Sequence, residues 1–247
     1  MVPDQATRPL PAGHADACPR GFATAVASGR LENKMIKVYA FATPNSVRVP
    51  IALEELGLSY ALTAINVRKG EQKQPAYLAI NPNGKVPVLV DSDGPDGKPL
   101  TLGESGAILL YLAEKTGKLL PMHGEARFRV LEQMFFHLTG IGPALGQAGY
   151  FQKQAPEPQP SARARFENEI SRVMQVLDGT LAQRTYVAGG EFTIADIVHF
   201  GWMWRRSFAD VDLKLYPNVQ RWYDLIDGRP AVQKALDKVN ALIPANA

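Results

Sequence analysis

The sequence predicts an α/β domain with a mixed β-sheet, followed by an all-helical domain. Between residues 36 and 121, short β-rich runs alternate with amphipathic helical runs, whereas beyond this stretch the strand signals nearly disappear. A length of 247 residues accommodates one large domain or two small ones that share an interface. We therefore expect an extension over residues 1–34, an α/β domain over 35–121 and a helical domain over 122–247.

The N-terminal segment, residues 1–34, mixes Pro, Gly, Ala, Arg and Asp without the periodicity of a helix or a strand. We expect it to be a flexible extension. Met35 stands directly before the first strand-like run, so either the chain begins naturally at Met35 or the segment is a genuine appendage. Asp4, Asp16 and Glu32 interrupt it, which argues against a transit peptide.

Cys18 is the only cysteine of the chain. A single thiol excludes an intramolecular disulfide, a zinc site with two thiolates and a Cys-x-x-Cys redox centre. Because Cys18 falls in the extension, we interpret it as an exposed thiol without a partner. Any redox sulfur used by the two domains would then have to arrive with a ligand.

The net charge of +3 is small, and no basic stripe suits nucleic acid as a partner. No run of about 18 apolar residues is present, and the N-terminal region lacks the apolar core of a signal peptide. The four histidines show no metal-ligand spacing. We therefore expect a cytoplasmic protein without a metal site that binds neither nucleic acid nor membranes.

The α/β domain opens with a strand, a helix and a second strand. Residues 36–41 predict the first strand. Apolar residues recur at i, i+3, i+4 and i+7 from Val49 to Leu56, which predicts a helix that Gly57 ends. Residues 60–67 predict the second strand. Since these elements lie within about thirty residues, we expect a right-handed parallel crossover.

Two further strands and a helix complete this domain. Residues 86–91 and 99–101 predict strands, and the turn residues Gly-Pro-Asp-Gly at 94–97 between them favour an antiparallel pair. The sheet should therefore be mixed. Residues 104–116 predict a helix that Gly117 ends.

Helical patterns dominate the remainder of the chain, over residues 124–150, 161–184, 193–206, 217–227 and 230–240. Thr193 and Asp196 have the spacing of a capping box, in which each side chain hydrogen-bonds the backbone amide of the other residue. Phe192 and Ile197 add a hydrophobic staple. We interpret these residues as the nucleus of a helix rather than as a site of chemistry.

Three motifs stand at defined places in this order of elements. They are Asn-Gly-Lys-Val-Pro at 83–87, Glu-Ser-Gly-Ala-Ile at 104–108 and the capping box at 193–196. With these motifs, the β-α-β-α-β-β-α unit and the helices after it resemble the cytosolic glutathione transferases from Met35 almost to the C-terminus. The resemblance implies a thioredoxin-like first domain that binds glutathione.

Three other segments narrow the resemblance. Thr-Pro-Asn at 43–45, Lys-Gly-Glu-Gln at 69–72 and the glycine-rich run at 140–147 are similar to the bacterial Nu-class group, which is related to the fungal nitrogen-regulation prion protein. The group implies a glutathione-dependent disulfide-bond oxidoreductase that acts as a homodimer. It also implies that Gln72 contacts glutathione and that Arg165 reaches the glutathione bound by the partner subunit.

The resemblance assigns glutathione-binding roles to Val86, Pro87, Glu104 and Ser105. It implies a cis peptide bond at Val86-Pro87, which would turn the backbone of Val86 toward an extended peptide; an ordinary buried strand valine is the alternative. At the helix start, Ser105 would donate to the γ-glutamyl carboxylate and Glu104 would accept from its ammonium. Helix capping is the rival interpretation of both.

Thr43 and Asn45 lie at the turn between the first strand and helix, where the resemblance implies the glutathione sulfur. Hydrogen-bond donors lower the pKa of a thiol because they stabilise the thiolate. The Thr43 hydroxyl and an Asn45 amide would therefore be the catalytic groups, with Ser46 as the alternative to Thr43. We interpret Tyr39, inside the strand, as a packing residue.

Other candidate sites have weaker support. Gly140, Gly142 and Gly146 do not follow a strand, which argues against a dinucleotide site, and Ser105 lacks a hydrolase elbow. Trp202 is interpreted first as a packing residue and second as the lining of a second-substrate pocket. The same two interpretations, in the same order, apply to Trp204 and Arg205. Tyr150 and Phe151 are further candidates for that pocket, and His199 is interpreted as a packed residue.

Three functions remain open at this stage. The first is a glutathione-dependent disulfide reductase, in which glutathione supplies the sulfur and the protein ionises and positions it. The second is a glutathione transferase that conjugates electrophiles or reduces hydroperoxides. The third is a non-catalytic protein of the same fold that senses glutathione. A small disulfide or an electrophile would be the second substrate of either enzyme.

Overall fold

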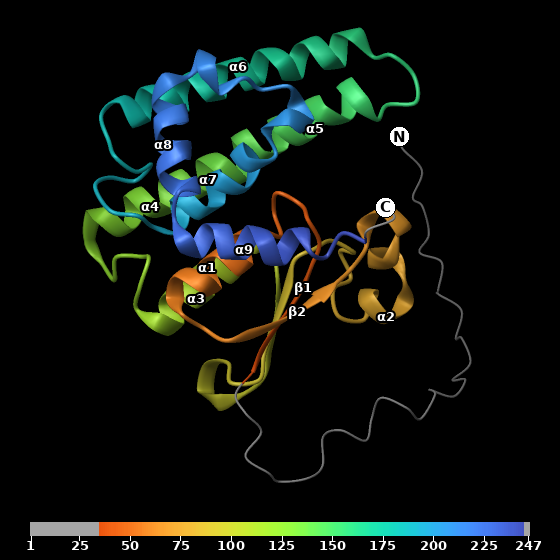
Figure 1. Ribbon diagram of the computed structural model, residues 1–247, viewed down its shortest axis with the longest axis vertical. Coiled ribbons are helices and arrows are strands. Elements are labelled where there is room, and N and C mark those ends of the chain that lie inside the picture. Colours follow the sequence, from red (N-terminus) through yellow and green to blue (C-terminus); the bar gives the residue numbers. More distant parts are fainter. Residues whose placement is uncertain (1–34, 245–247) are drawn as a thin grey trace, which may run out of the picture. The chain divides into compact units, whose positions relative to one another are not determined.

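The computed structural model describes residues 35–244. The predicted extension over residues 1–34, with Cys18, lies outside the described residues, and its flexibility stays a prediction. The chain follows the predicted class, with a small mixed sheet and its helices first and a set of long helices after it (Figure 1). Within the described part of the chain, no helix is long and apolar enough to cross a membrane.

The sheet has four strands in the order β2-β1-β3-β4. Its strands are β1 (Ile36–Ala40), β2 (Tyr60–Ala64), β3 (Val88–Asp91) and β4 (Leu100–Gly103). β1 pairs with β2 in parallel, with Val38 opposite Leu62, and with β3 antiparallel, with Val38 opposite Leu89. The parallel crossover and the antiparallel pair of β3 and β4 are therefore both confirmed.

Three α-helices of the described residues belong to the first domain, namely α1 (Arg48–Leu56), the short α2 (Pro75–Leu78) and α3 (Ser105–Thr116). Gly57 ends α1 at φ 69° and Gly117 ends α3 at φ 67°, so both predicted stop signals are left-handed caps. α1 packs against α3 and also against α7 and α9 of the second domain, whereas α2 lies apart from them (Figure 1).

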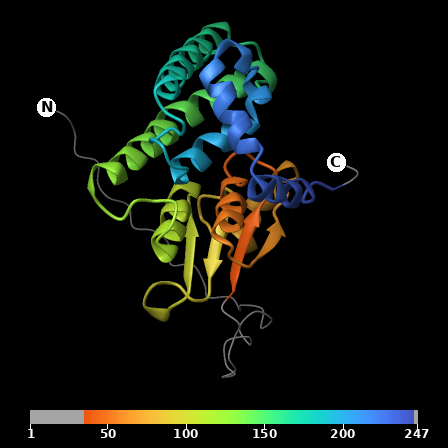
Figure 2. The same cartoon turned by 60° about the vertical axis from the view of Figure 1, so that its left-hand side comes forward.

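The second domain contains six α-helices and one π-helical segment within the described residues. They are α4 (Gly124–Phe136), η4 (His137–Ile141), α5 (Gly142–Lys153), α6 (Pro160–Ala182), α7 (Ile194–Trp204), α8 (Pro217–Asp227) and α9 (Pro230–Asn240). The short 3-10 helices η5 (Arg206–Ala209) and η6 (Leu213–Leu215) lie between α7 and α8. Figure 2 shows them stacked on the side of α1 and α3 that faces away from the sheet. The single helix predicted over 124–150 is continuous in space but contains the π-helical turn η4, which its periodicity does not indicate.

Two predicted strands are shorter than expected by two residues or more. The strand predicted over 60–67 ends at Ala64, because the Asn66 side chain accepts from the backbone amides of Arg68 and Lys69, at 3.0 and 3.3 Å, and starts a helical turn. The strand predicted over 86–91 begins only at Val88, after the peptide bond between Val86 and Pro87, which is cis as expected.

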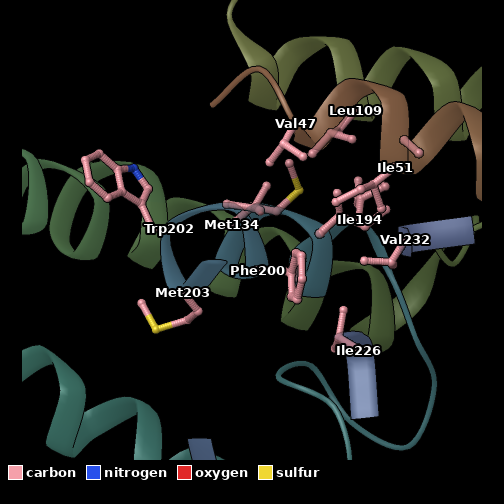
Figure 3. Close-up of a cluster of buried hydrophobic side chains, with 14 of the residues drawn as sticks. Val47, Ile51, Leu109, Met134, Ile194, Phe200, Trp202, Met203, Ile226 and Val232 are labelled. Carbon is pink, nitrogen blue, oxygen red and sulfur yellow. The ribbon is translucent and has the colours of Figure 1, made fainter. Parts of the chain in front are cut away.

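The two domains share one hydrophobic core. Figure 3 shows Val47 and Leu109 of the first domain beside Met134 and Ile194 of the second, and all four belong to one cluster of buried hydrophobic residues. The capping box at the start of α7 is confirmed, and Asp196 is fully buried. A Cβ atom at Gly201 of α7 would overlap the carbonyl oxygen of Pro44, so the second domain lies directly against the turn after β1.

Candidate functional site

The turn between β1 and α1 carries Thr43 and Asn45. The Thr43 amide donates to the Phe41 carbonyl at 2.7 Å, and the Thr43 carbonyl accepts from the Val47 amide at 3.2 Å. By contrast, neither the backbone amide nor the side chain of Asn45 has a hydrogen-bond partner within residues 35–244. Free amides next to a helix start can bind an anion, so this turn is available to a negatively charged group.

Thr43 is held by Ser46. The hydroxyl of Thr43 donates to Ser46 Oγ at 2.9 Å, and the Ser46 amide donates to Thr43 Oγ1 at 3.2 Å. Ser46 is fully buried, whereas Thr43 is half-buried and borders a cavity. Of the two hydroxyls weighed from the sequence, only that of Thr43 is therefore accessible to a ligand.

A cavity of about 240 Å³ lies at the start of α3, and we call it the α3 cavity. Its lining residues are Asn45, Asn81, Lys85, Val86, Pro87, Glu104 and Ser105. Five of the residues predicted from the sequence thus meet in one place. They come from three separate segments of the first domain, which only the folded sheet brings together.

Val86 presents a free backbone edge in the α3 cavity. Among the described residues, no backbone group pairs with its N–H or its C=O. The preceding carbonyl, of Lys85, accepts from the Tyr77 hydroxyl at 2.7 Å and from Asn81 Nδ2 at 2.8 Å, which holds the loop in place. A rigid edge with an unpaired donor and acceptor is suited to an extended peptide.

The start of α3 is uncapped and strained. Glu104 precedes the helix with φ 60° and ψ 110°, and its side chain makes no capping hydrogen bond. Such a backbone conformation costs about 1–3 kcal/mol for a residue other than glycine. Glu104 Oε1 instead accepts from Asn83 Nδ2 at 3.4 Å, and Ser105 is buried at the cavity wall. The helix end therefore faces the α3 cavity with its amides free.

A second cavity, of about 500 Å³, adjoins the same turn, and we call it the Thr43 cavity. It is lined by Ala42, Thr43, Pro44, Arg68, Lys153, Gln154, Trp202, Arg205, Ser207 and Phe208. Thr43 and Asn45 are two positions apart in the chain and border different cavities. The turn after β1 thus forms the boundary between the two.

The Thr43 cavity is positively charged. No carboxylate oxygen of the described residues forms an ion pair with Arg68 or Arg205, while Lys153 pairs with Asp210 at 2.7 Å. Arg205 Nη2 donates to the Ala42 carbonyl at 2.8 Å. Burial, with a further contribution from Arg68, lowers the pKa of Arg205. Two uncompensated guanidinium groups attract an anionic ligand to this cavity.

Trp202 serves both roles considered for it. It is largely buried, and a Cβ atom at Gly142 or Gly146 would lie 3.2 or 3.5 Å from its indole ring, so the glycine-rich run lets the ring rest on α5. The indole points away from the other labelled core side chains in Figure 3 and lines the Thr43 cavity. Tyr150 and Phe151 do not line it.

Gln72 and Arg165 line neither cavity. Gln72 donates from Nε2 to the Val67 carbonyl at 3.4 Å, and its backbone carbonyl lies against Gly84, next to the α3 cavity. Arg165, on α6, lines a separate hollow of about 580 Å³ together with residues of η4 and α5. The glutathione contacts that the sequence predicts for Gln72 and Arg165 stay predictions.

The packing roles expected for two other residues are confirmed. The Tyr39 ring meets that of Tyr77 edge-on, with centroids 6.3 Å apart. His199 is fully buried, and its Nε2 lies 3.1 Å from the Gln133 carbonyl. In the part of the chain that the structure describes, no three His, Cys, Asp or Glu side chains gather as metal ligands would.

Sequence reasoning named Arg205 as a candidate for lining a second-substrate pocket, and the structure places it in the Thr43 cavity, but sequence reasoning missed Arg48 and Arg68. Arg48, the first residue of α1, is fully buried, although its spacing three and four residues before Ile51 and Ala52 could have placed it on the apolar face. Arg68 and Arg205 meet across 137 positions, and no local signal indicates that they share a cavity.

Two family models match the chain. The model described as glutathione S-transferase, N-terminal domain, matches residues 42–115. The model described as glutathione S-transferase, C-terminal domain, matches residues 138–230. The two matches fall on the α/β part and the helical part of the molecule, and the first of them contains the residues that line the α3 cavity.

Individual proteins are similar over nearly their whole length. The disulfide-bond oxidoreductase YfcG of Escherichia coli is 41% identical over 205 residues, which are 83% of this chain and 95% of that protein. A glutathione transferase family member from Pseudomonas fluorescens, solved with two glutathione molecules bound, has a TM-score of 0.78 at 38% identity over 81% of this chain and 92% of its own. A glutathione transferase from Pseudomonas putida, solved with one glutathione disulfide per subunit, has a TM-score of 0.78 at 37% identity, over 84% and 93%.

Proposed function

Because the chain belongs to the glutathione S-transferase family, we propose that it is a glutathione-dependent disulfide-bond reductase. One observation carries the proposal: a single turn, with Thr43 and Asn45, borders a peptide-sized cavity on one side and a larger cationic cavity on the other. A sulfur held at this turn would be open to a second substrate. The name of the Escherichia coli relative supports the same reaction.

The α3 cavity suits glutathione. The unpaired backbone of Val86 can pair with the cysteinyl residue of the tripeptide as an added strand would. The free amides at the start of α3 and the Ser105 hydroxyl can bind the γ-glutamyl carboxylate, and Glu104 can accept from the γ-glutamyl ammonium. Lys85, on the same wall, offers a positive charge to the second carboxylate.

Thr43 and Asn45 would stabilise the thiolate. A free thiol has a pKa near 8.5 and is mostly protonated at neutral pH, and hydrogen-bond donors lower that pKa. Asn45 has a free amide and a free side chain to donate. For Thr43 to donate, the hydroxyl pair with Ser46 must reverse, so that Ser46 donates to Thr43 Oγ1 and the Thr43 proton turns toward the sulfur.

The reaction is an exchange of sulfur partners. The glutathione thiolate attacks one sulfur of a disulfide, which forms a mixed disulfide and releases the other sulfur as a thiolate that takes up a proton. A second glutathione thiolate attacks the glutathione sulfur of the mixed disulfide, which yields glutathione disulfide and a second thiol. Since residues 36–247 contain no cysteine, both attacking sulfurs belong to glutathione.

The charge of the Thr43 cavity favours a disulfide that carries carboxylates. Arg68 and Arg205 would pair with the carboxylates of a mixed disulfide or of a second glutathione, whereas a neutral aryl halide would leave both guanidinium groups unpaired. Trp202 and Phe208 form an apolar part of the same wall. They favour conjugation of an apolar electrophile or reduction of a hydroperoxide as the second candidate function.

We further propose that the chain acts as a homodimer. Phe128 and Phe135 are 69% and 61% exposed and lie on the same face of α4, two helical turns apart. Leaving two phenylalanine rings exposed to water on one face is unfavourable, so this face is suited to a partner. Arg165 lines neither cavity of its own chain, as expected of a residue that serves the partner. The cytoplasmic location also stays a proposal.

A side-by-side assay of three substrates tests the function. The purified protein is given glutathione with a small anionic disulfide, an aryl halide or a hydroperoxide, and turnover is followed for each. We expect the disulfide to be the best substrate. A higher kcat/KM for the aryl halide or the hydroperoxide would reject the reductase and favour the second candidate, and no turnover with glutathione binding intact would favour a sensing role.

A further inference from the structure

A buried arginine connects the α3 cavity with the second domain. Arg48 is 1% exposed and donates three hydrogen bonds to three different segments. Its Nε donates to the Val198 carbonyl at 3.0 Å, its Nη1 to Ser105 Oγ at 3.0 Å and its Nη2 to His137 Nε2 at 2.6 Å. Arg48 itself lines neither cavity, but Ser105 does.

The hydrogen bond to Ser105 fixes the direction of the serine hydroxyl. A guanidinium group has only donors, so Ser105 Oγ must accept from Arg48. The hydroxyl proton of Ser105 is then not used by Arg48, and no other described residue accepts it. Because Ser105 lines the α3 cavity, this proton is available to an acceptor there, such as a carboxylate oxygen.

Arg48 also carries a charge that the described protein does not neutralise. No Asp or Glu oxygen of residues 35–244 forms an ion pair with it. Burial lowers the pKa of Arg48 to about 9, so it stays protonated at neutral pH. Burial, His199 and the charge of Arg48 keep the pKa of His137 well below its usual value, so His137 accepts as a neutral ring. A buried cation without a counter-ion favours an anion at its open side.

We propose that Arg48 is a positioning residue for glutathione binding, which acts through Ser105: its guanidinium holds the serine hydroxyl as a donor toward the γ-glutamyl carboxylate, and its positive charge strengthens that donor. The proposal rests on the proposed function of the α3 cavity as the glutathione site. It explains why an arginine is buried at the start of α1 without a carboxylate partner.

A double-mutant cycle tests this role. The affinity for reduced glutathione is measured by isothermal titration calorimetry for the parent, Arg48→Met, Ser105→Ala and the double variant. We expect each single change to lower the affinity about tenfold. The affinity of the double variant should be no lower than that of the single variant with the lower affinity. Arg221→Met is the matched control, because Arg221 donates to the Leu181 and Arg184 carbonyls away from both cavities, and its affinity should equal that of the parent.

Arg48→Lys replaces Arg48→Met in the binding measurement if Arg48→Met does not fold. Lysine retains the charge but not three fixed donors, so we expect a loss of about threefold to fivefold with Ser105 present and none in the Ser105→Ala background. Thermal unfolding of each variant identifies any misfolded protein before titration. A merely structural arginine would change the unfolding temperature without this dependence on Ser105.

Two failures are distinguishable. Unchanged affinity in Ser105→Ala would reject the proposed glutathione site at this residue, whatever Arg48 does. The role of Arg48 alone would be rejected by either of two results, each with weakened binding in Ser105→Ala. One is unchanged affinity in both Arg48→Met and Arg48→Lys, and the other is losses of affinity that add in the double variants.

Discussion

Helices α3 and α7 begin in opposite ways. At α7, Asp196 accepts from the Val187 and Thr193 amides and from Trp222 Nε1, each at 2.9 Å, and all of these groups are buried. At α3, Glu104 makes no cap and its backbone is strained, and the helix end opens into a cavity. The protein thus satisfies one helix start internally and leaves the other for a ligand, which separates a structural helix terminus from a functional one.

Removing the internal cap should have the largest effect on stability. Asp196→Ala leaves two backbone amides and an indole N–H buried without acceptors, so we expect the free energy of unfolding to fall by about 3 kcal/mol. Urea unfolding measures it. Asp237→Ala, on the exposed face of α9, is the control. A loss below about 1 kcal/mol would show that α7 does not depend on its cap.

Acid should weaken the buried interior around α7. Burial lowers the pKa of His199 to about 3, whereas in the unfolded chain it is about 6.5. The unfolded state therefore binds a proton first, and stability is lost as the pH falls below about 6.5. Between pH 7 and pH 5, we expect the parent to lose about 2 kcal/mol more than His199→Gln in urea unfolding.

The comparison of the parent with His199→Gln separates the contribution of His199 to the pH dependence from that of other titrating groups. His137 is also kept neutral and acts in the same direction in both proteins. Burial raises the pKa of Asp196, which acts in the opposite direction, because a proton then binds the folded state more readily. Parallel pH profiles for the parent and His199→Gln would contradict the assignment.

In the turn before α1, Thr43 should matter mainly for turnover, although its loss also leaves the amide and hydroxyl of the buried Ser46 without a partner. Thr43→Val removes the hydroxyl at nearly constant volume, so we expect disulfide reductase kcat to fall tenfold or more, as for other donors to a developing negative charge. Thr180→Val on α6 makes the same chemical change away from both cavities and should leave kcat unaltered. Equal turnover in Thr43→Val and the parent would exclude Thr43 as the sulfur donor.

Glu104 should affect substrate binding to a smaller extent. Glu104→Gln removes the negative charge that we assign to the γ-glutamyl ammonium, so KM for glutathione should rise about fivefold, the effect of about 1 kcal/mol expected at an exposed pair. The free energy of unfolding should stay the same, in contrast with Asp196→Ala. Glu114→Gln, on α3, provides the control. An unchanged KM would leave Glu104 outside the glutathione site.

Cys18→Ser should change neither turnover nor stability. Cys18 lies outside the described residues, and the proposed reaction takes both of its sulfurs from glutathione. Steady-state kinetics with the small disulfide measures the effect. Loss of activity in Cys18→Ser would mean that the protein supplies a sulfur of its own.

Helix ends and caps could be predicted from the sequence, because each depends on residues within a few positions of it. Gly57 and Gly117 ended two helices as expected, and the spacing of Thr193 and Asp196 predicted a cap that forms. Short motifs likewise indicated Asn45, Val86 and Ser105, which meet in the α3 cavity. Each of these residues lies in a motif whose structure depends mainly on its own neighbours.

The features that sequence reasoning missed depend on distant segments. Arg48 is buried by Val198, 150 positions away, and by His137, 89 positions away. The charge of the Thr43 cavity likewise arises where Arg68 and Arg205 approach each other across the two domains. A charged residue in the first turn of a helix is ordinarily exposed, and only the spacing of Arg48 before Ile51 and Ala52 indicates that it lies on the apolar face.

Gly201 sets a condition for engineering this molecule. Because any side chain there would collide with the Pro44 carbonyl, the helical domain acts as a template for the turn that carries Thr43 and Asn45. A chimera that joins this α/β domain to the helical domain of another protein would therefore have to keep a glycine at this point of α7. Substrate preference could be exchanged by such a graft only if the grafted helix preserves this single close approach.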